Sequence, residues 1–245
     1  MGTVNKPDIV KQTIVINDDY VRKNRRADGK IGLVMGYADT NNKRIIINKF
    51  TVDKNAKLLN DFDVADISHR INSVDESDIV AHESQHIHNG AIGYNYIANS
   101  DNIYECMMLS LADEMSAMLA GYLHKYKNVD NALADVFKNL SGVIRQHYIT
   151  CQFQNHFNHL QKLYGTDKDL YEHKFDSKKI NKILKHYFTI DGIQVMDTMS
   201  KESKIKFGQF MIDIKSDIKK HIDSYVAQQK SASHMISGNN KGYSY

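Results

Sequence analysis

Residues 79–90 read IVAHESQHIHNG, and this stretch decides how the rest of the chain is interpreted. On a helix, residues four apart lie on one face, so His82 and His86 can bind one metal ion together. Glu83 follows the first histidine and can reach a water on that metal, an arrangement typical of zinc hydrolases. The residue frequencies of this chain give roughly 0.01 to 0.02 chance occurrences of such a pattern. The alternative is an exposed helix whose histidines coincide by chance.

The flanking residues predict one short helix around the two histidines. Asp75, Ser77 and Asp78 offer side-chain oxygens and negative charge to the amino-terminal end of a helix. Gly90 stands where a residue in the left-handed conformation would end it. We therefore expect this helix to end at Gly90 and residues 91–99 to form a loop.

A zinc site of this kind needs a third protein ligand and leaves the fourth position to water. The metzincin arrangement is excluded, because Asn89 and Ile92 occupy the positions of its glycine and third histidine. The strongest helical pattern nearby covers residues 100–125, and Glu114 lies in the middle of its apolar stripe. A buried carboxylate is normally held by a metal or by a salt bridge, and both readings stay open. Asp113, about 100° around the helix, is the weaker candidate ligand.

These residues resemble the gluzincin zinc metallopeptidases, which combine a His-Glu-x-x-His helix with a glutamate from a following helix. The resemblance covers residues 82–86 and 113–120. It implies that His82, His86 and Glu114 hold Zn²⁺ and that Glu83 is catalytic. The chain departs from the family at Met118, where gluzincins often carry an aspartate that orients a ligand histidine. The residues leave Asp113, Asp101 or a backbone carbonyl to supply that acceptor.

Composition limits the class of protein. The chain has 245 residues, of which 42% are hydrophobic and 25% charged, as in ordinary globular proteins. Its net charge of +3 is too small to indicate a nucleic-acid partner. No apolar run is long enough for a membrane span and no signal-peptide core precedes residue 10. Two cysteines far apart in sequence are expected to be reduced, so we expect a cytoplasmic protein.

The amino-terminal part predicts strands. Residues 11–17 are typical of one strand, and residues 31–38 and 44–50 of two more with turn residues between them. The predicted fold class is α+β, with a small N-terminal antiparallel sheet followed by a mainly helical, zincin-like domain. In zincins a strand beside the active-site helix can pair with an extended peptide, although this hairpin could equally cover the core. Residues 53–70 predict a further helix.

Beyond residue 130 the pattern is helical, and we expect one domain over residues 1–228 followed by a polar tail over residues 229–245. The expected helical segments are residues 131–164, 177–189 and 198–228. A hydrogen-bond donor for a transition state would come from the histidines and tyrosines of this part, namely His147, His156, His159, Tyr148, Tyr164 and Tyr171.

Two functions agree with the sequence. The first is a zinc-dependent peptidase that cleaves protein or peptide substrates, with Glu83 as the general base. The second is a structural subunit of a virion or another large assembly, in which any metal only stabilises the fold. A peptidase activity that a chelator abolishes would distinguish them.

Overall fold

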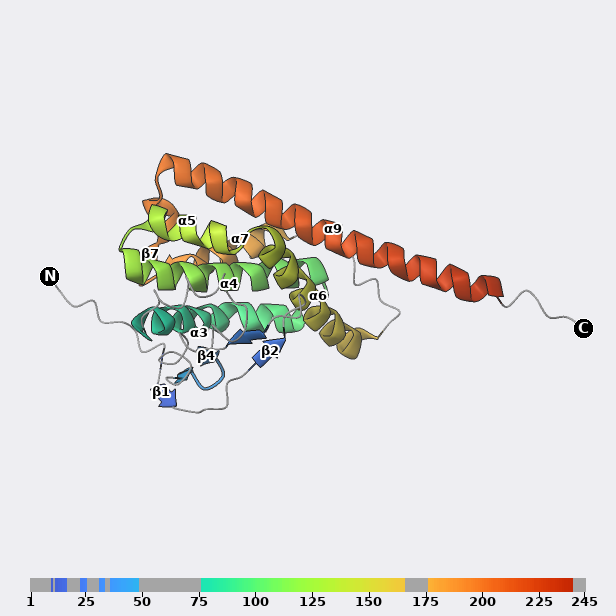
Figure 1. The fold of residues 1–245 in the computed structure, drawn as a ribbon, viewed down its shortest axis with the longest axis horizontal. Helices are drawn as coiled ribbons and strands as arrows, with labels where there is room; N and C mark the ends of the chain where they lie inside the picture. Colours follow the sequence, from blue (N-terminus) through green and yellow to red (C-terminus); the bar gives the residue numbers. More distant parts are fainter. Residues whose placement is uncertain are drawn as a thin grey trace, which may run out of the picture.

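The computed structural model describes residues 10, 12–16, 23–25, 31–33, 36–48, 76–165 and 176–239. This part of the chain is mostly helical, and each of its strands has five residues or fewer. Two helices form its centre, α3 (Glu76–Asn99) and α4 (Ile103–Tyr126). They run antiparallel, side by side, with the strands on the side of α3 that faces away from α4 (Figure 1). The α+β class is therefore correct at this level.

Helix α3 passes through Gly90 and ends at Asn99, so the prediction that it ends at Gly90 is wrong. The glycines of this helix serve packing instead of termination. A Cβ at Gly90 would lie 2.8 Å from Cδ2 of Tyr94, and one at Gly93 would lie 1.7 Å from the hydroxyl oxygen of Tyr187. Tyrosine rings thus occupy the space that side chains would need, and the predicted loop over residues 91–99 is helical.

Helix α4 is the central helix of the core. Asn102 caps its amino terminus by accepting a hydrogen bond from the backbone N–H of Glu105 at 3.2 Å. Lys127 ends it in the left-handed conformation, with φ of 53°. Its apolar side chains are almost fully buried against helices on several sides; the largest are Met107, Met108, Leu109, Leu111, Met115 and Leu119. Burying each contributes roughly 1.5–3 kcal/mol, so α4 is held rigidly in place.

The main sheet has three strands in the order β1-β5-β4, formed by Gln12–Ile16, Arg44–Asn48 and Gly36–Asp39. The predicted hairpin is present, because β4 and β5 pair antiparallel. The prediction of an antiparallel sheet is wrong in part, because β1 pairs parallel to β5. The central strand β5 buries isoleucines against α3 and needs a neighbour on each side, and composition does not fix the direction of that neighbour.

A second pair of strands lies outside the main sheet. β2 (Lys23–Arg25) pairs antiparallel with β3 (Ile31–Leu33). The single strand predicted over residues 31–38 is therefore two strands, β3 and β4. The helix predicted over residues 53–70 lies outside the described residues.

The helices after α4 cover its far side. They are α5 (Val129–Asn139), α6 (Gly142–Tyr164), α7 (Ser177–Tyr187), the short α8 (Val195–Thr198) and α9 (Lys201–Asn239), with β6 (Thr189–Ile190) and β7 (Ile193–Gln194) between α7 and α8. The segment predicted over residues 131–164 is two helices, because Gly142 with φ of 54° separates them.

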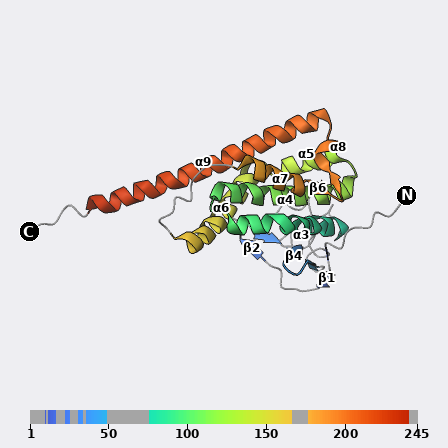
Figure 2. The ribbon, with the colours of Figure 1, turned by 180° about the vertical axis from the view of Figure 1, so that it is seen from behind.

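Helix α9 lies across the outer side of the bundle and continues past it (Figures 1 and 2). Its amino-terminal part buries Phe207, Ile214 and Ile218 in the core. It extends to Asn239, beyond the end predicted at residue 228, so much of the segment predicted as a polar tail is helical.

Candidate metal centre

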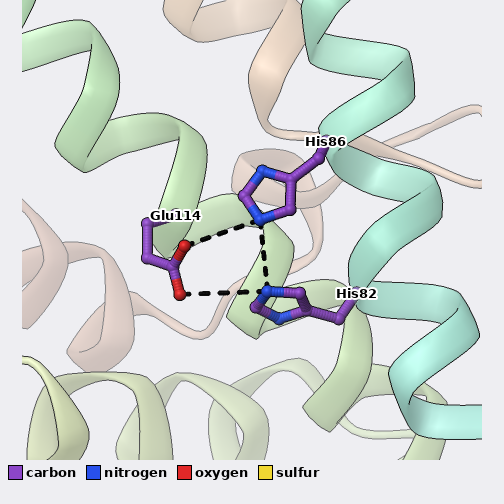
Figure 3. A group of neighbouring side chains, drawn as sticks. All are labelled: His82, His86 and Glu114. Atoms are coloured by element: carbon purple, nitrogen blue, oxygen red, sulfur yellow. Dashed lines mark hydrogen bonds and ion pairs between the residues drawn. The ribbon is translucent and has the colours of Figure 1, made fainter. Parts of the chain in front are cut away.

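Three side chains meet between α3 and α4 (Figure 3). The Nε2 atoms of His82 and His86 lie 3.2 Å apart. The carboxylate of Glu114 is 3.8 Å from Nε2 of His82 and 3.5 Å from Nε2 of His86. One ligand atom from each residue therefore faces a common centre, and this group could hold a metal ion. The structure thus brings together the three residues that the sequence nominated.

The side chains of this centre influence one another's charge even before any metal binds. Burial opposes the ionisation of Glu114, but the hydrogen bond to His86 and the positive charges of both histidines outweigh it and lower its pKa to about 2. Burial also opposes protonation of His86, yet Asp113 and Glu114 raise the pKa of that ring well above its ordinary value. The two carboxylates thus hold a proton on His86, and a metal cation that binds Nε2 would have to take the place of that proton.

Asp113 lies on the outer side of His86. Its Oδ2 accepts a hydrogen bond from Nδ1 of His86 at 2.9 Å. This contact turns Nε2 of His86 towards His82 and Glu114, as the acceptors beside metal-bound histidines do. Among the acceptors that the sequence left open, Asp113 is therefore the one beside His86, and it is not a member of the candidate ligand group, which is formed by His82, His86 and Glu114. Asp101, the other aspartate considered, precedes α4 and is about three helical turns from Asp113.

Glu83 is buried beside the same centre and faces strand β4. It accepts a hydrogen bond from the backbone N–H of Ala38. Burial raises the pKa of Glu83, although the positive charges of His82 and His86 oppose that rise. Gly36 leaves room for the neighbouring Ile79, since a Cβ there would lie 2.8 Å from Cγ2 of Ile79, whereas its distance of 3.6 Å from Cγ of Glu83 would be an ordinary contact. A carboxylate with a raised pKa can accept a proton near neutral pH and return it.

The three residues and Glu83 lie at a cavity of about 490 Å³. Strand β4 forms one wall, and α6 forms another with Tyr148, Gln152 and His156. The hydroxyl of Tyr148 donates to Glu114, and burial together with the negative charge of Glu114 raises the pKa of Tyr148 well above its ordinary value. Tyr148 is therefore a phenol hydrogen-bond donor beside the centre.

Among the residues proposed as transition-state donors, the cavity selects Tyr148 and His156. Oγ of Ser110 and Nε2 of His156 share a hydrogen bond of 2.7 Å, and burial lowers the pKa of His156 to about 4. His147, His159 and Tyr164 do not line it, and Tyr171 lies outside the described residues.

Sequence reasoning missed several residues here. Tyr187 lines the cavity from α7, a contact between distant segments that no local pattern signals. Gln85 and Asn89 are buried polar residues close to the centre. Their spacing from His82 and His86 places them near the same side of α3, which is a signal that could have identified them.

The search of protein-family models, curated proteins and solved structures found no match to this chain. Among the described helices, none is both long enough and apolar enough to cross a membrane.

Proposed function

We propose that the chain is a zinc-dependent metallopeptidase with a zincin-like arrangement of α3, α4 and the hairpin of β4 and β5. The observation that carries this proposal is the meeting of Nε2 of His82, Nε2 of His86 and the carboxylate of Glu114 around one point. The metal fits on distance. Ligand bonds of about 2.0–2.2 Å in a tetrahedron place donor atoms roughly 3.3–3.5 Å apart. The observed separations are 3.2, 3.5 and 3.8 Å.

The chemistry divides between the metal and the chain. Zinc bound by these three residues supplies a Lewis acid that polarises a carbonyl group and lowers the pKa of a coordinated water. Glu83 takes the proton of the attacking water and returns it to the leaving amine, a role that its raised pKa suits. Tyr148, whose single hydroxyl hydrogen goes to Glu114 in this structure, would release that bond and donate instead to the oxygen that becomes negative during the attack.

The substrate we propose is an extended peptide. Strand β4 is an edge strand of the described three-stranded sheet and lines the cavity through Gly36, Tyr37 and Ala38. Because the N–H of Ala38 points to Glu83, the edge of β4 that faces away from β5 lies beside the proposed reaction centre. A peptide that adds to this edge as a further strand would place its backbone carbonyl groups beside Glu83.

The test is chelator-sensitive cleavage by the purified chain. Denatured casein and a quenched-fluorescence peptide library serve as substrates, with protein depleted of metal and then reloaded with zinc. We expect cleavage by the reloaded protein, no cleavage after chelation, and no cleavage by His82→Ala. Zinc-loaded wild-type protein that cleaves neither substrate would contradict the proposal.

A second candidate is a structural subunit of a virion or another large assembly. The observation in its favour is α9, which extends beyond the bundle and exposes Ile205 and Ile212 at 65% and 59%. These residues are seven apart and lie on one face, as in helices that pack against a partner. Under this candidate, substituting both isoleucines with lysine abolishes assembly. Chelation changes the stability of the protein, which has no peptidase activity with or without metal. The first candidate agrees with a location in the cytoplasm, and the second agrees with a location in a virion.

A further inference from the structure

Two buried amide side chains connect the candidate metal centre to a distant part of the fold. Nε2 of Gln85 donates to the backbone carbonyl of Tyr187 at 2.8 Å and to Oδ1 of Asn89 at 2.9 Å. Nδ2 of Asn89 donates to Oδ1 of Asp113 at 2.7 Å and to Oγ of Ser116 at 2.7 Å. Since Asp113 also accepts from His86 at 2.9 Å, a continuous chain of hydrogen bonds runs from α7 to the ligand histidine.

Each bond in this chain has only one possible direction. The backbone carbonyl of Tyr187 can only accept, so the NH₂ group of Gln85 must face it. The second hydrogen of that NH₂ group goes to Asn89, which therefore presents its oxygen to Gln85 and its own NH₂ group to Asp113. Ionised Asp113 can only accept, so Nδ1 of His86 must carry a hydrogen. When the ring is neutral, as metal binding requires, the lone pair of His86 is then on Nε2, the atom that faces His82 and Glu114.

We propose that Asn89 and Gln85 are positioning residues for the metal. They hold the carboxylate of Asp113 in place, and through it they fix the tautomer and the ring orientation of His86. Asn89 touches Asp113 directly, whereas Gln85 acts through Asn89, so Asn89 has the larger effect. The proposal rests on the proposed function only in that a metal binds His82, His86 and Glu114.

A purely structural role for the same amides makes a different prediction. Both side chains are buried, at 5% for Gln85 and 1% for Asn89, and removing either leaves polar groups without partners. Stability falls in both cases. Only the positioning role also lowers the affinity for metal in protein that is still folded.

Asn139 supplies a matched control. It is buried at 7%, and its amide donates to the hydroxyl of Tyr122, away from the cavity-lining residues. Asn139→Leu removes a buried amide as Asn89→Leu does. It therefore reproduces the loss of stability without touching the chain of hydrogen bonds to His86.

The experiment measures zinc affinity by competition with a chromophoric chelator, on full-length protein shown to be folded by circular dichroism. We expect Asn89→Leu to lower the affinity roughly 10-fold, Gln85→Met to lower it less, and Asn139→Leu to leave it unchanged. In the zinc-loaded protein, NMR with labelled histidine should detect the Nδ1 hydrogen of His86, with faster exchange against water in Asn89→Leu. If Asn89→Leu does not fold, the zinc affinity of Gln85→Met and the exchange rate of the Nδ1 hydrogen of His86 in that variant decide between the two roles.

The outcomes separate the two proposals. Wild-type zinc affinity in a folded Asn89→Leu variant, or in Gln85→Met should Asn89→Leu not fold, would overturn the positioning role and leave the metal centre standing. A wild-type protein that binds no zinc would overturn both. An equal loss of affinity in Asn139→Leu would show that general destabilisation is the cause, and it would also overturn the positioning role.

Discussion

Asp113 and Glu114 hold opposite nitrogens of one ring: Oδ2 of Asp113 is 2.9 Å from Nδ1 of His86, and Oε2 of Glu114 is 3.5 Å from Nε2. Adjacent residues on a helix point about 100° apart, so two consecutive carboxylates can flank an imidazole that lies between them. One short segment of α4 thus supplies both the proposed third ligand and the acceptor that faces the other nitrogen of the proposed second ligand.

Asp113→Asn is expected to lower zinc affinity by about 10- to 100-fold. The substituted side chain keeps the size of aspartate but loses the charge, and its amide oxygen can take the place of only one of the two carboxylate oxygens that accept from His86 and Asn89. Competition with a chelator measures the change. Asp101→Asn, at the exposed start of α4, is the control and should bind zinc as wild type does.

Glu83→Gln is expected to keep zinc and to lose turnover. Glu83 is not in the ligand group, so metal content by elemental analysis should equal that of wild type. Glutamine cannot accept the proton of a water, so cleavage of the peptide library should fall by at least about 100-fold. His82→Ala, in contrast, should lose both metal and turnover. Cleavage at the wild-type rate by Glu83→Gln would exclude Glu83 as the general base.

His156 should make the protein less stable in mild acid. Burial lowers the pKa of His156 to about 4 in the folded protein, from an ordinary value of 6.5. Between these values the unfolded chain binds a proton that the folded chain does not, so the free energy of unfolding falls as the pH is lowered from about 6.5 to about 4. The contribution is on the order of 3 kcal/mol, from about 1.4 kcal/mol for each pH unit over this range.

Urea unfolding at several pH values measures this effect. His156→Gln should remove most of the slope between pH 6.5 and 4. His159→Gln removes only the smaller cause of the lowered pKa, the charge of His159, and should keep most of the slope. A slope in His156→Gln as steep as that of wild type would assign the acid sensitivity to other groups.

The ligand group could be predicted from sequence because its signals are local. The spacing of His82 and His86 is the period of one helix, and the position of Glu114 within an apolar stripe indicates a buried carboxylate that needs a partner. Asp113 could be nominated for the same reason, but its role depended on the rotation of α4 against α3. The packing of the two helices sets that rotation, and the sequence of either helix alone does not determine it.

The other differences have both local and distant causes. Glycine favours a helix end, but at Gly90 the ring of Tyr94, one turn later in α3, fills the space that a side chain would need. The direction of β1 depends on the path of the chain between residues 16 and 44, which composition does not determine. The amides Gln85 and Asn89 acquire their role only when the carbonyl of Tyr187 arrives from α7.

Glycine-to-alanine substitution should have opposite effects at two helical positions of this chain. At Gly93 in α3, a Cβ would lie 1.7 Å from the hydroxyl oxygen of Tyr187 and 2.6 Å from its Cζ, so the ring must move. Overpacking of this kind costs about 1–3 kcal/mol. At Gly208 in α9, nothing lies within 4 Å of the added Cβ, and alanine should stabilise the protein by about 0.5–1 kcal/mol through its higher helix propensity.

Thermal and urea unfolding of both variants measure the contrast. The backbone of Tyr187 also anchors Gln85, so Gly93→Ala should disturb the chain of hydrogen bonds that ends at His86 and weaken zinc binding, whereas Gly208→Ala should not. Tyr187→Phe removes the atom in closest conflict and should recover part of the stability lost in Gly93→Ala, but not all of it, because Cζ and Cε1 of the ring would still lie 2.6 and 2.9 Å from the added carbon. If Gly93→Ala were as stable as Gly208→Ala, the ring of Tyr187 would not be packed against α3, and α3 would not need a glycine at residue 93.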